Sequence, residues 1–163
     1  MLVGLLSDTH DRAHAAAEGV RLLRAAGAEF YVHCGDVGSN AVLDHLAGEH
    51  AAFVFGNNDW DRAELRRYAE AIGVRCLGAH DTLDLGGKRA AVTHGDDGPL
   101  LRRLLEAQAH DYVFLGHSHV YGQERVGRTL VVNPGALHRA RVKTVAILDT
   151  ATDAVRFIEV PGV

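Results

Sequence analysis

The sequence predicts an α/β fold of two packed mixed sheets with helices on their outer faces. In the first half, short apolar runs alternate with amphipathic helical patterns, which is typical of parallel βα units. In the second half, paired apolar runs around tight turns indicate antiparallel strands. No repeat, low-complexity stretch or linker interrupts the 163 residues, so we expect a single domain over residues 1–163.

The strands of the first half are short apolar runs. Their β-branched and aromatic residues favour buried parallel strands, predicted at 2–6, 30–32, 53–55 and 74–77. The second half predicts a hairpin at 82–93 turning at Gly86–Gly87, and a helix over 99–108. A strand at 112–115 follows, and two further hairpins turn at Gly127 and between Asp149 and Asp153.

Three helices are expected between the first strands. Residues 13–23 carry an apolar stripe at three- and four-residue spacing that ends before Gly27, a favourable C′ residue. Ser39 is a suitable N-cap for a second helix. A third helix is expected after Asp59, which can cap it, with its apolar stripe over 65–72.

Five polar fragments follow the predicted strands. They are Asp8-Thr9-His10, Gly35-Asp36, Gly56-Asn57-Asn58-Asp59, His94-Gly95 and Gly116-His117-Ser118-His119. Ligands collect beyond the carboxyl ends of strands in open α/β sheets, because the loops converge there. Two carboxylates, one amide and four imidazoles in such places suit two divalent cations of intermediate hardness. The sequence therefore predicts a dinuclear metallohydrolase.

Each fragment alone has an ordinary explanation. Asp8 could cap a helix, and residues 56–59 have the composition of a turn. The alternate histidines His117 and His119 are more specific, because at a strand end they are expected to point the same way. The agreement of all five in order and position favours the metal site. His33, inside a predicted strand, is expected to be a hydrogen-bonded core residue.

Composition excludes several other classes. The formal net charge of -4 gives no basic excess for a broad nucleic-acid surface. The opening apolar run has no charged leader and meets Asp8 at once, so we expect no signal peptide, no membrane association and a cytoplasmic protein. Cys34 and Cys76 are expected to be buried, inert thiols rather than a disulfide framework.

The ordered fragments resemble the calcineurin-like metallophosphoesterase family, in particular its short single-domain prokaryotic phosphodiesterase branch, over nearly the whole chain. The resemblance implies a four-layer α/β/β/α sandwich. It implies one metal site formed by Asp8, His10, Asp36 and His119, and a second formed by Asp36, Asn57, His94 and His117, with Asp36 bridging. The function implied is a phosphoric ester hydrolase, a phosphodiesterase rather than a phosphomonoesterase, acting by in-line attack of a metal-bridging hydroxide.

The resemblance also implies the cofactors and the residues that meet substrate. The all-N/O ligand set suits two divalent transition ions, with manganese expected and iron, nickel, cobalt or zinc as alternatives. The substrate is expected to be a small phosphate ester contacted by Asn57 and by one residue after the Asn133-Pro134-Gly135 turn. His138, Arg139 and Arg141 all follow that turn, an arginine is the better phosphate binder, and Arg141 is the candidate. A homo-oligomer is compatible with the sequence.

Three positions depart from the family pattern. Asn58 replaces the histidine that is thought to protonate the leaving group, oriented by the acid that matches Asp59; an amide cannot titrate. Asp96 replaces a second histidine after His94, and Ala136 replaces a serine. None removes a predicted ligand, and Asn58 and Asp59 remain the candidate catalytic pair.

Two other functions compete with the phosphoesterase. A metallo-β-lactamase-type site would need Asp and His where Tyr121 and Gly122 stand. A non-catalytic, metal-binding interaction scaffold of the same fold is the stronger rival, and Asn58 is the residue that favours it. Retention of every predicted metal ligand favours the enzyme.

Overall fold

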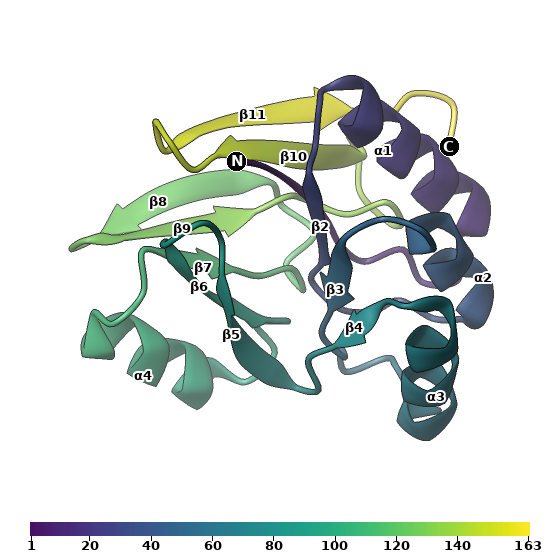
Figure 1. The fold of residues 1–163 in the computed structure, drawn as a ribbon, viewed down its shortest axis with the longest axis horizontal. Helices are drawn as coiled ribbons and strands as arrows, with labels where there is room; N and C mark the ends of the chain where they lie inside the picture. Colours follow the sequence, from purple (N-terminus) through teal and green to yellow (C-terminus); the bar gives the residue numbers. More distant parts are fainter.

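The computed structural model describes residues 1–163 and contains two mixed β-sheets (Figure 1). The first sheet has the strand order β11-β10-β1-β2-β3-β4. Strands β1 to β4 run parallel, and β10 pairs antiparallel with both β1 and β11. Its strands are β1 (Leu2–Leu6), β2 (Phe30–His33), β3 (Ala51–Phe53), β4 (Arg75–Cys76), β10 (Thr144–Asp149) and β11 (Ala154–Glu159).

The second sheet has the order β5-β6-β7-β9-β8. Its centre, β6-β7-β9, is parallel, and the outer strands β5 and β8 each join it as one arm of an antiparallel hairpin. The strands are β5 (His80–Asp84), β6 (Arg89–Thr93), β7 (Tyr112–Phe114), β8 (Gly122–Val126) and β9 (Thr129–Asn133). All three predicted hairpins are therefore confirmed.

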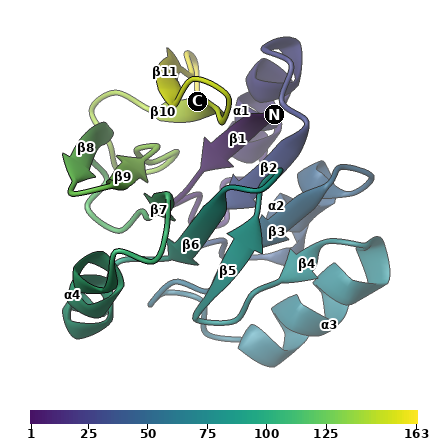
Figure 2. The same cartoon turned by 60° about the vertical axis from the view of Figure 1, so that its left-hand side comes forward.

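The helices cover the outer faces of the two sheets (Figures 1 and 2). Three lie beside the first sheet, and the fourth lies beside the second. The helices are α1 (Ala13–Ala25), α2 (Asn40–Leu43), α3 (Arg62–Ile72) and α4 (Gly98–Ala107), and a 3₁₀ turn (Asp44–Leu46) extends α2. The four-layer α/β/β/α arrangement implied by the resemblance is confirmed.

Two apolar cores separate the layers. Strand β1 contributes side chains to both cores: Val3 and Leu5 face the second sheet, whereas Leu6 faces the helices. Burial on both faces explains why the central strands are almost wholly apolar. The core between the sheets also contains Tyr112 and Phe114, whose rings stack 5.8 Å apart. The sheets therefore pack rigidly, and the strand ends that carry the polar fragments are fixed relative to one another.

Several predicted boundaries were wrong. Residues 53–55 were expected to be a strand, but β3 is Ala51–Phe53; residues 54 and 55 are buried beyond the end of the ladder. Likewise only Arg75–Cys76 of 74–77 pairs. Apolar residues indicate burial, and burial continues beyond the last residue that pairs with a neighbouring strand. Cys34 is buried as expected, whereas Cys76 is only partly so.

Of the three helix termini predicted from capping residues, only the end of α1 behaves as expected. Gly27 takes the expected left-handed conformation just after α1, with φ of 88°. Asp59 does not cap α3: Asp61 does, by accepting a hydrogen bond from the Glu64 N–H. Ser39 precedes α2, but its side chain makes no capping hydrogen bond. No helix is long and apolar enough to cross a membrane.

Candidate metal centre

The polar fragments converge where strands of both sheets end. Asp8 follows β1, Asp36 follows β2 and Asn57 follows β3, all from the first sheet. His94 follows β6 and His117 follows β7, from the second sheet. Residues far apart in the sequence thus meet at one edge of the sandwich, as the rule for the carboxyl ends of parallel strands anticipates.

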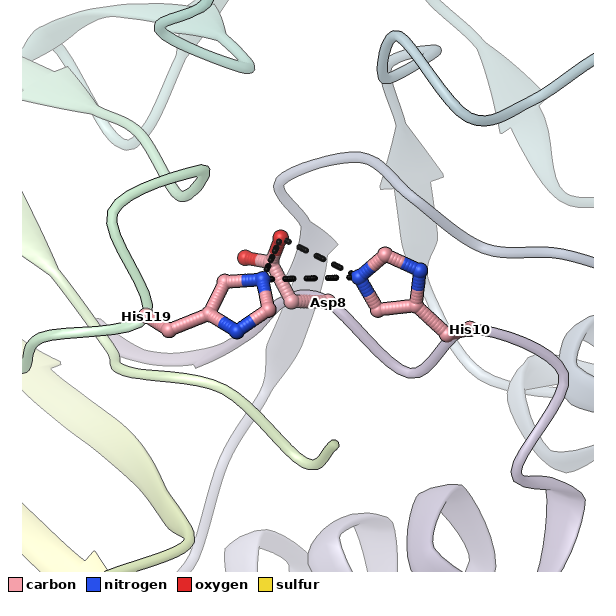
Figure 3. Close-up of side chains that lie close together, drawn as sticks. All are labelled: Asp8, His10 and His119. Carbon is pink, nitrogen blue, oxygen red and sulfur yellow. Dashed lines mark hydrogen bonds and ion pairs between the residues drawn. The ribbon is translucent and has the colours of Figure 1, made fainter. Parts of the chain in front are cut away.

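One group of ligand atoms consists of Asp8, His10 and His119 (Figure 3). The Asp8 carboxylate oxygen Oδ1 lies 3.1 Å from His119 Nε2 and 3.8 Å from His10 Nε2. The two imidazole nitrogens are 3.4 Å apart. Asp8 is fully buried, whereas the two histidines remain partly exposed. This group is therefore open to solvent on the histidine side.

A second group consists of Asp8, Asp36 and His94, all buried. His94 Nε2 lies 3.3 Å from Asp36 Oδ2 and 3.9 Å from Asp8 Oδ1. Asp36 Oδ2 also lies 3.4 Å from His10 Nε2, so it contacts an imidazole of each group. Both carboxylates consequently lie between the two groups, and either could be shared.

The buried donor atoms of this cluster fit a cation. Asp8 Oδ1 and His94 Nε2 are both buried and have no hydrogen-bond partner. Such atoms normally find a partner, because leaving one unsatisfied costs about 1–3 kcal/mol. His94 Nδ1 lies 2.8 Å from the Cys34 carbonyl and can donate to it, which directs the Nε2 lone pair at the carboxylates. The residues present therefore fit a divalent ion.

The shifted pKa values of Asp36 and His94 also favour a bound cation. Burial raises the pKa of the Asp36 carboxyl, but contacts from His94 and Asn58 outweigh burial and hold that pKa well below its usual range. Burial lowers the pKa of His94, but Asp36, the Cys34 carbonyl and Asp8 together raise it to about 9. The cluster thus attracts positive charge, which a proton or a metal ion can supply.

Asn58 is engaged with Asp36 instead of pointing into open space. Its backbone N–H donates to Asp36 Oδ1 and its side-chain Nδ2 donates to Oδ2, each at 2.8 Å. Asp59 is almost fully buried, and its carboxylate accepts from the backbone N–H groups of Gly38 and Gly56 at 2.8 Å. The two predicted catalytic residues thus hold the Asp36 loop in place.

His117 and Asn57 lie at the exposed margin of the centre. The expectation that His117 and His119 point the same way was wrong. The His117 ring packs 5.2 Å from His94, whereas the His119 ring packs 5.4 Å from His10. Both residues have left-handed backbone conformations, so they are not in extended strand geometry and period-two alternation does not apply.

Glycines permit the close approach of the loops. A Cβ on Gly56 would lie 2.1 Å from Asp36 Oδ1, and one on Gly116 would lie 2.0 Å from Ser7 Oγ and 2.6 Å from Asp8 Oδ2. Both glycines belong to the fragments identified in the sequence. Their role is to leave space for the carboxylates.

Several supporting contacts could not be identified from the sequence. Ser7 Oγ donates to Asp8 Oδ2, and Asn133 Nδ2 donates to the Gly116 carbonyl and Ser118 Oγ. His33 Nδ1 accepts from the Gly35 N–H, while its Nε2 lies 2.9 Å from Thr9 Oγ1. Burial lowers the pKa of His33 to about 3, so it is the neutral core histidine that the sequence predicted. These contacts fix the ligand loops but leave no sequence pattern of their own.

A pocket of about 360 Å³ opens beside the centre. Arg139 lines it, whereas Arg141, the predicted substrate contact, is exposed elsewhere and does not. The His138 ring lies 5.4 Å from that of His10. The pocket is lined by His10, Asp11, Asp36, Gly38, Asn58, Trp60, His138 and Arg139.

Comparisons with known proteins agree with this geometry. A phosphodiesterase of Methanocaldococcus jannaschii is 28% identical over 155 residues, covering 92% of this chain and 93% of the relative. A probable metallophosphoesterase of Bacillus subtilis is 30% identical, covering 99% and 93%. The solved structure of an archaeal phosphodiesterase superposes with a TM-score of 0.90 at 27% identity, covering 98% of this chain and 99% of that one.

The family model of the calcineurin-like phosphoesterase superfamily domain matches residues 1–153. That match spans nearly the whole chain and includes every ligand atom described above. The chain belongs to the calcineurin-like phosphoesterase superfamily.

Proposed function

We propose that this protein is a metal-dependent phosphodiesterase. The observation that carries the proposal is the pair of buried, unpartnered atoms, Asp8 Oδ1 and His94 Nε2, which face one another within the ligand cluster. Both the Methanocaldococcus jannaschii relative and the archaeal solved structure, which cover nearly the whole chain, are named phosphodiesterases. When bound, divalent ions supply an acidified water and positive charge for a phosphate group.

The ligand assignment is part of the proposal. Asp8, His10, Asp36 and His119 would hold one ion, and Asp36, Asn57, His94 and His117 the other. The short distances from Asp36 Oδ2 to both His10 and His94 support a bridging role for Asp36. Asp8 lies equally between the groups, so it also contributes charge to both. An all-N/O set without thiolate is compatible with manganese, which we propose as the ion.

The other residues have distinct roles in this proposal. Asn58 and the buried Asp59 position Asp36 and its loop, so neither is proposed as a proton donor to the leaving group. Without such a donor, departure depends on the acidity of the leaving group itself, so aryl esters are expected to react faster than alkyl esters. His138 and Arg139, which line the pocket, are proposed to contact the phosphate.

The scaffold alternative is not favoured. A metal-binding scaffold would need the same ligand cluster, so the cluster alone does not separate the two functions. The preference for the enzyme rests on the relative and the solved structure that cover nearly the whole chain, both of which are named phosphodiesterases.

Two measurements on the same preparation test the proposal: metal content after reconstitution, and hydrolysis of bis(4-nitrophenyl) phosphate. We expect about two ions per chain and metal-dependent turnover. Asp36→Asn keeps the shape but removes charge, so metal occupancy and turnover should fall together by at least tenfold. Asp96→Asn, an exposed acid that follows His94 but lies in neither ligand group, is the matched control. Folded protein with no bound metal, or full turnover in Asp36→Asn, would overturn the assignment.

A further inference from the structure

The most exposed large apolar side chain lies beside the metal centre. Trp60 is the only tryptophan of the chain, and 86% of its surface is exposed. A tryptophan side chain normally buries a large area, so an indole in water forgoes a substantial gain in stability. Its exposure is unexplained by the fold, because the ring has no aromatic or cation partner.

The backbone on both sides of Trp60 is anchored. Asp59, on one side, is 3% exposed and accepts two backbone hydrogen bonds. Asp61, on the other side, caps helix α3 through the Glu64 N–H. The indole is therefore held outside the protein by a fixed segment, and it does not belong to a loose terminus or loop tip.

Trp60 lines the pocket beside the ligand cluster. That pocket contains His10 and Asp36 of the cluster, and Trp60 is its only apolar residue. The cationic side chain of Arg139 and the imidazole of His138 line it too. Its volume of about 360 Å³ lies in the range of small-molecule sites. One aromatic surface beside a site with charges for phosphate is the arrangement that binds a phosphate joined to a planar ring.

We propose that Trp60 determines specificity by stacking on a planar aromatic group, a nucleobase or an aryl ring, attached to the phosphate ester at the metal centre. The inference rests on the proposed function, because the stacking requires that the phosphate be held at the metal centre. Stacking on an indole is tolerant of which base or ring is bound, because every such ring has a π-face. The substrate class is therefore aromatic phosphodiesters, and the phosphate would contact Arg139 and His138.

Binding of product-like ligands to the manganese-loaded protein tests the stacking directly. AMP is compared with ribose 5-phosphate, and phenyl phosphate with methyl phosphate, so that a nucleobase and an aryl ring are tested separately. We expect each aromatic ligand to bind about five- to 20-fold more tightly than its non-aromatic partner. Because Trp60 is the only tryptophan, the aromatic ligands should also quench the intrinsic indole fluorescence, whereas the others should not.

Substitutions separate stacking from a structural role. Trp60→Ala should abolish the aromatic preference while leaving methyl phosphate affinity unchanged, and Trp60→Phe should retain part of it. On aromatic diesters, Trp60→Ala should raise KM more than it lowers kcat, because a stacking contact stabilises the bound substrate and the transition state to the same extent. Tyr121→Ala, which removes another exposed aromatic ring outside this pocket, is the control and should keep the preference.

The possible failures are distinguishable. Equal affinities within both ligand pairs, with normal metal content and diester turnover, would overturn the role of Trp60 and leave the proposed function intact. A loss of methyl phosphate affinity in Trp60→Ala, or a lower sedimentation coefficient than that of the unmodified protein, would show that the indole supports the site or an interface between copies instead. Metal-loaded protein that hydrolyses no diester would defeat the proposed function itself.

Discussion

Asn58→Ala is the substitution that best tests how the Asp36 carboxylate is held. It removes the Nδ2 donor to Asp36 Oδ2 but keeps the backbone N–H that donates to Oδ1. A hydrogen bond to a charged group contributes about 1.5–3 kcal/mol, and the exposed position of Asn58 favours the lower end. Two effects then compete, because losing a donor makes the carboxylate more basic while releasing its orientation.

We expect the loss of carboxylate orientation to affect metal affinity more than the gain in basicity does. Oδ2 lies within 3.4 Å of two imidazole nitrogens, so a small rotation of the carboxylate separates it from one of them. Loss of contacts that orient metal ligands typically lowers metal affinity 10- to 100-fold. Since the backbone donor remains, we expect about tenfold weaker metal binding and turnover that recovers at high metal concentration.

Chelator competition measures the metal affinity, and turnover is followed as metal is titrated. Asn40→Ala is the matched control, because it also removes an Asn Nδ2 donor to a carboxylate, that of Glu64, away from the centre. Metal affinity and turnover should be unchanged in that variant. Equal metal affinity in Asn58→Ala and the unmodified protein would refute the positioning role of Asn58.

Two other predictions concern the same cluster. The pKa of His94 is raised from 6.5 to about 9 in the fold, so in metal-free protein its stabilising contribution is complete below pH 6.5 and is lost as pH rises through about 9. Thermal unfolding should show Tm falling over that window, and calorimetry in two buffers should detect proton release on metal binding; a flat Tm would contradict it. Gly56→Ala would place its Cβ 2.1 Å from Asp36 Oδ1, so it should lower both metal content and stability. Gly122→Ala, which has open space around its Cβ, should leave metal content unchanged and alter the free energy of unfolding by no more than about 0.5 kcal/mol. Comparable denaturation midpoints for the two glycine variants would exclude the steric argument.

The parts of the fold that could be predicted are those with a local signal. The stripe over 13–23 gives α1, and the turns at Gly86–Gly87 and Gly127 give two hairpins, because periodicity and turn chemistry act over a few residues. The end of β3 has no such signal: Val54 and Phe55 are as buried as the strand itself. Whether a buried residue pairs depends on how far the neighbouring strand continues.

The site also has a part that the sequence could predict and a part that it could not. The order of the polar fragments after strands was enough to bring Asp8, Asp36 and His94 together. It could not show that Asn58 donates to Asp36, since that contact depends on the path of two loops. Nor could it choose Arg139 over Arg141 as the pocket residue, because Arg139 has a φ of 52° that redirects the chain after the turn.

Backbone strain is concentrated at the ligand positions, and it explains why strand alternation failed to predict the directions of His117 and His119. Of the nine non-glycine residues with positive φ, five are predicted ligands: Asp8, His10, Asp36, His117 and His119. The left-handed region costs an L-residue roughly 1 kcal/mol, somewhat less for Asp and His, so a chain selected for stability alone would place glycine or asparagine there. Asn and Gly cannot provide a carboxylate or an imidazole. The fold therefore tolerates several kcal/mol of strain that only the side-chain chemistry accounts for, and that concentration is itself evidence that these residues bind a ligand.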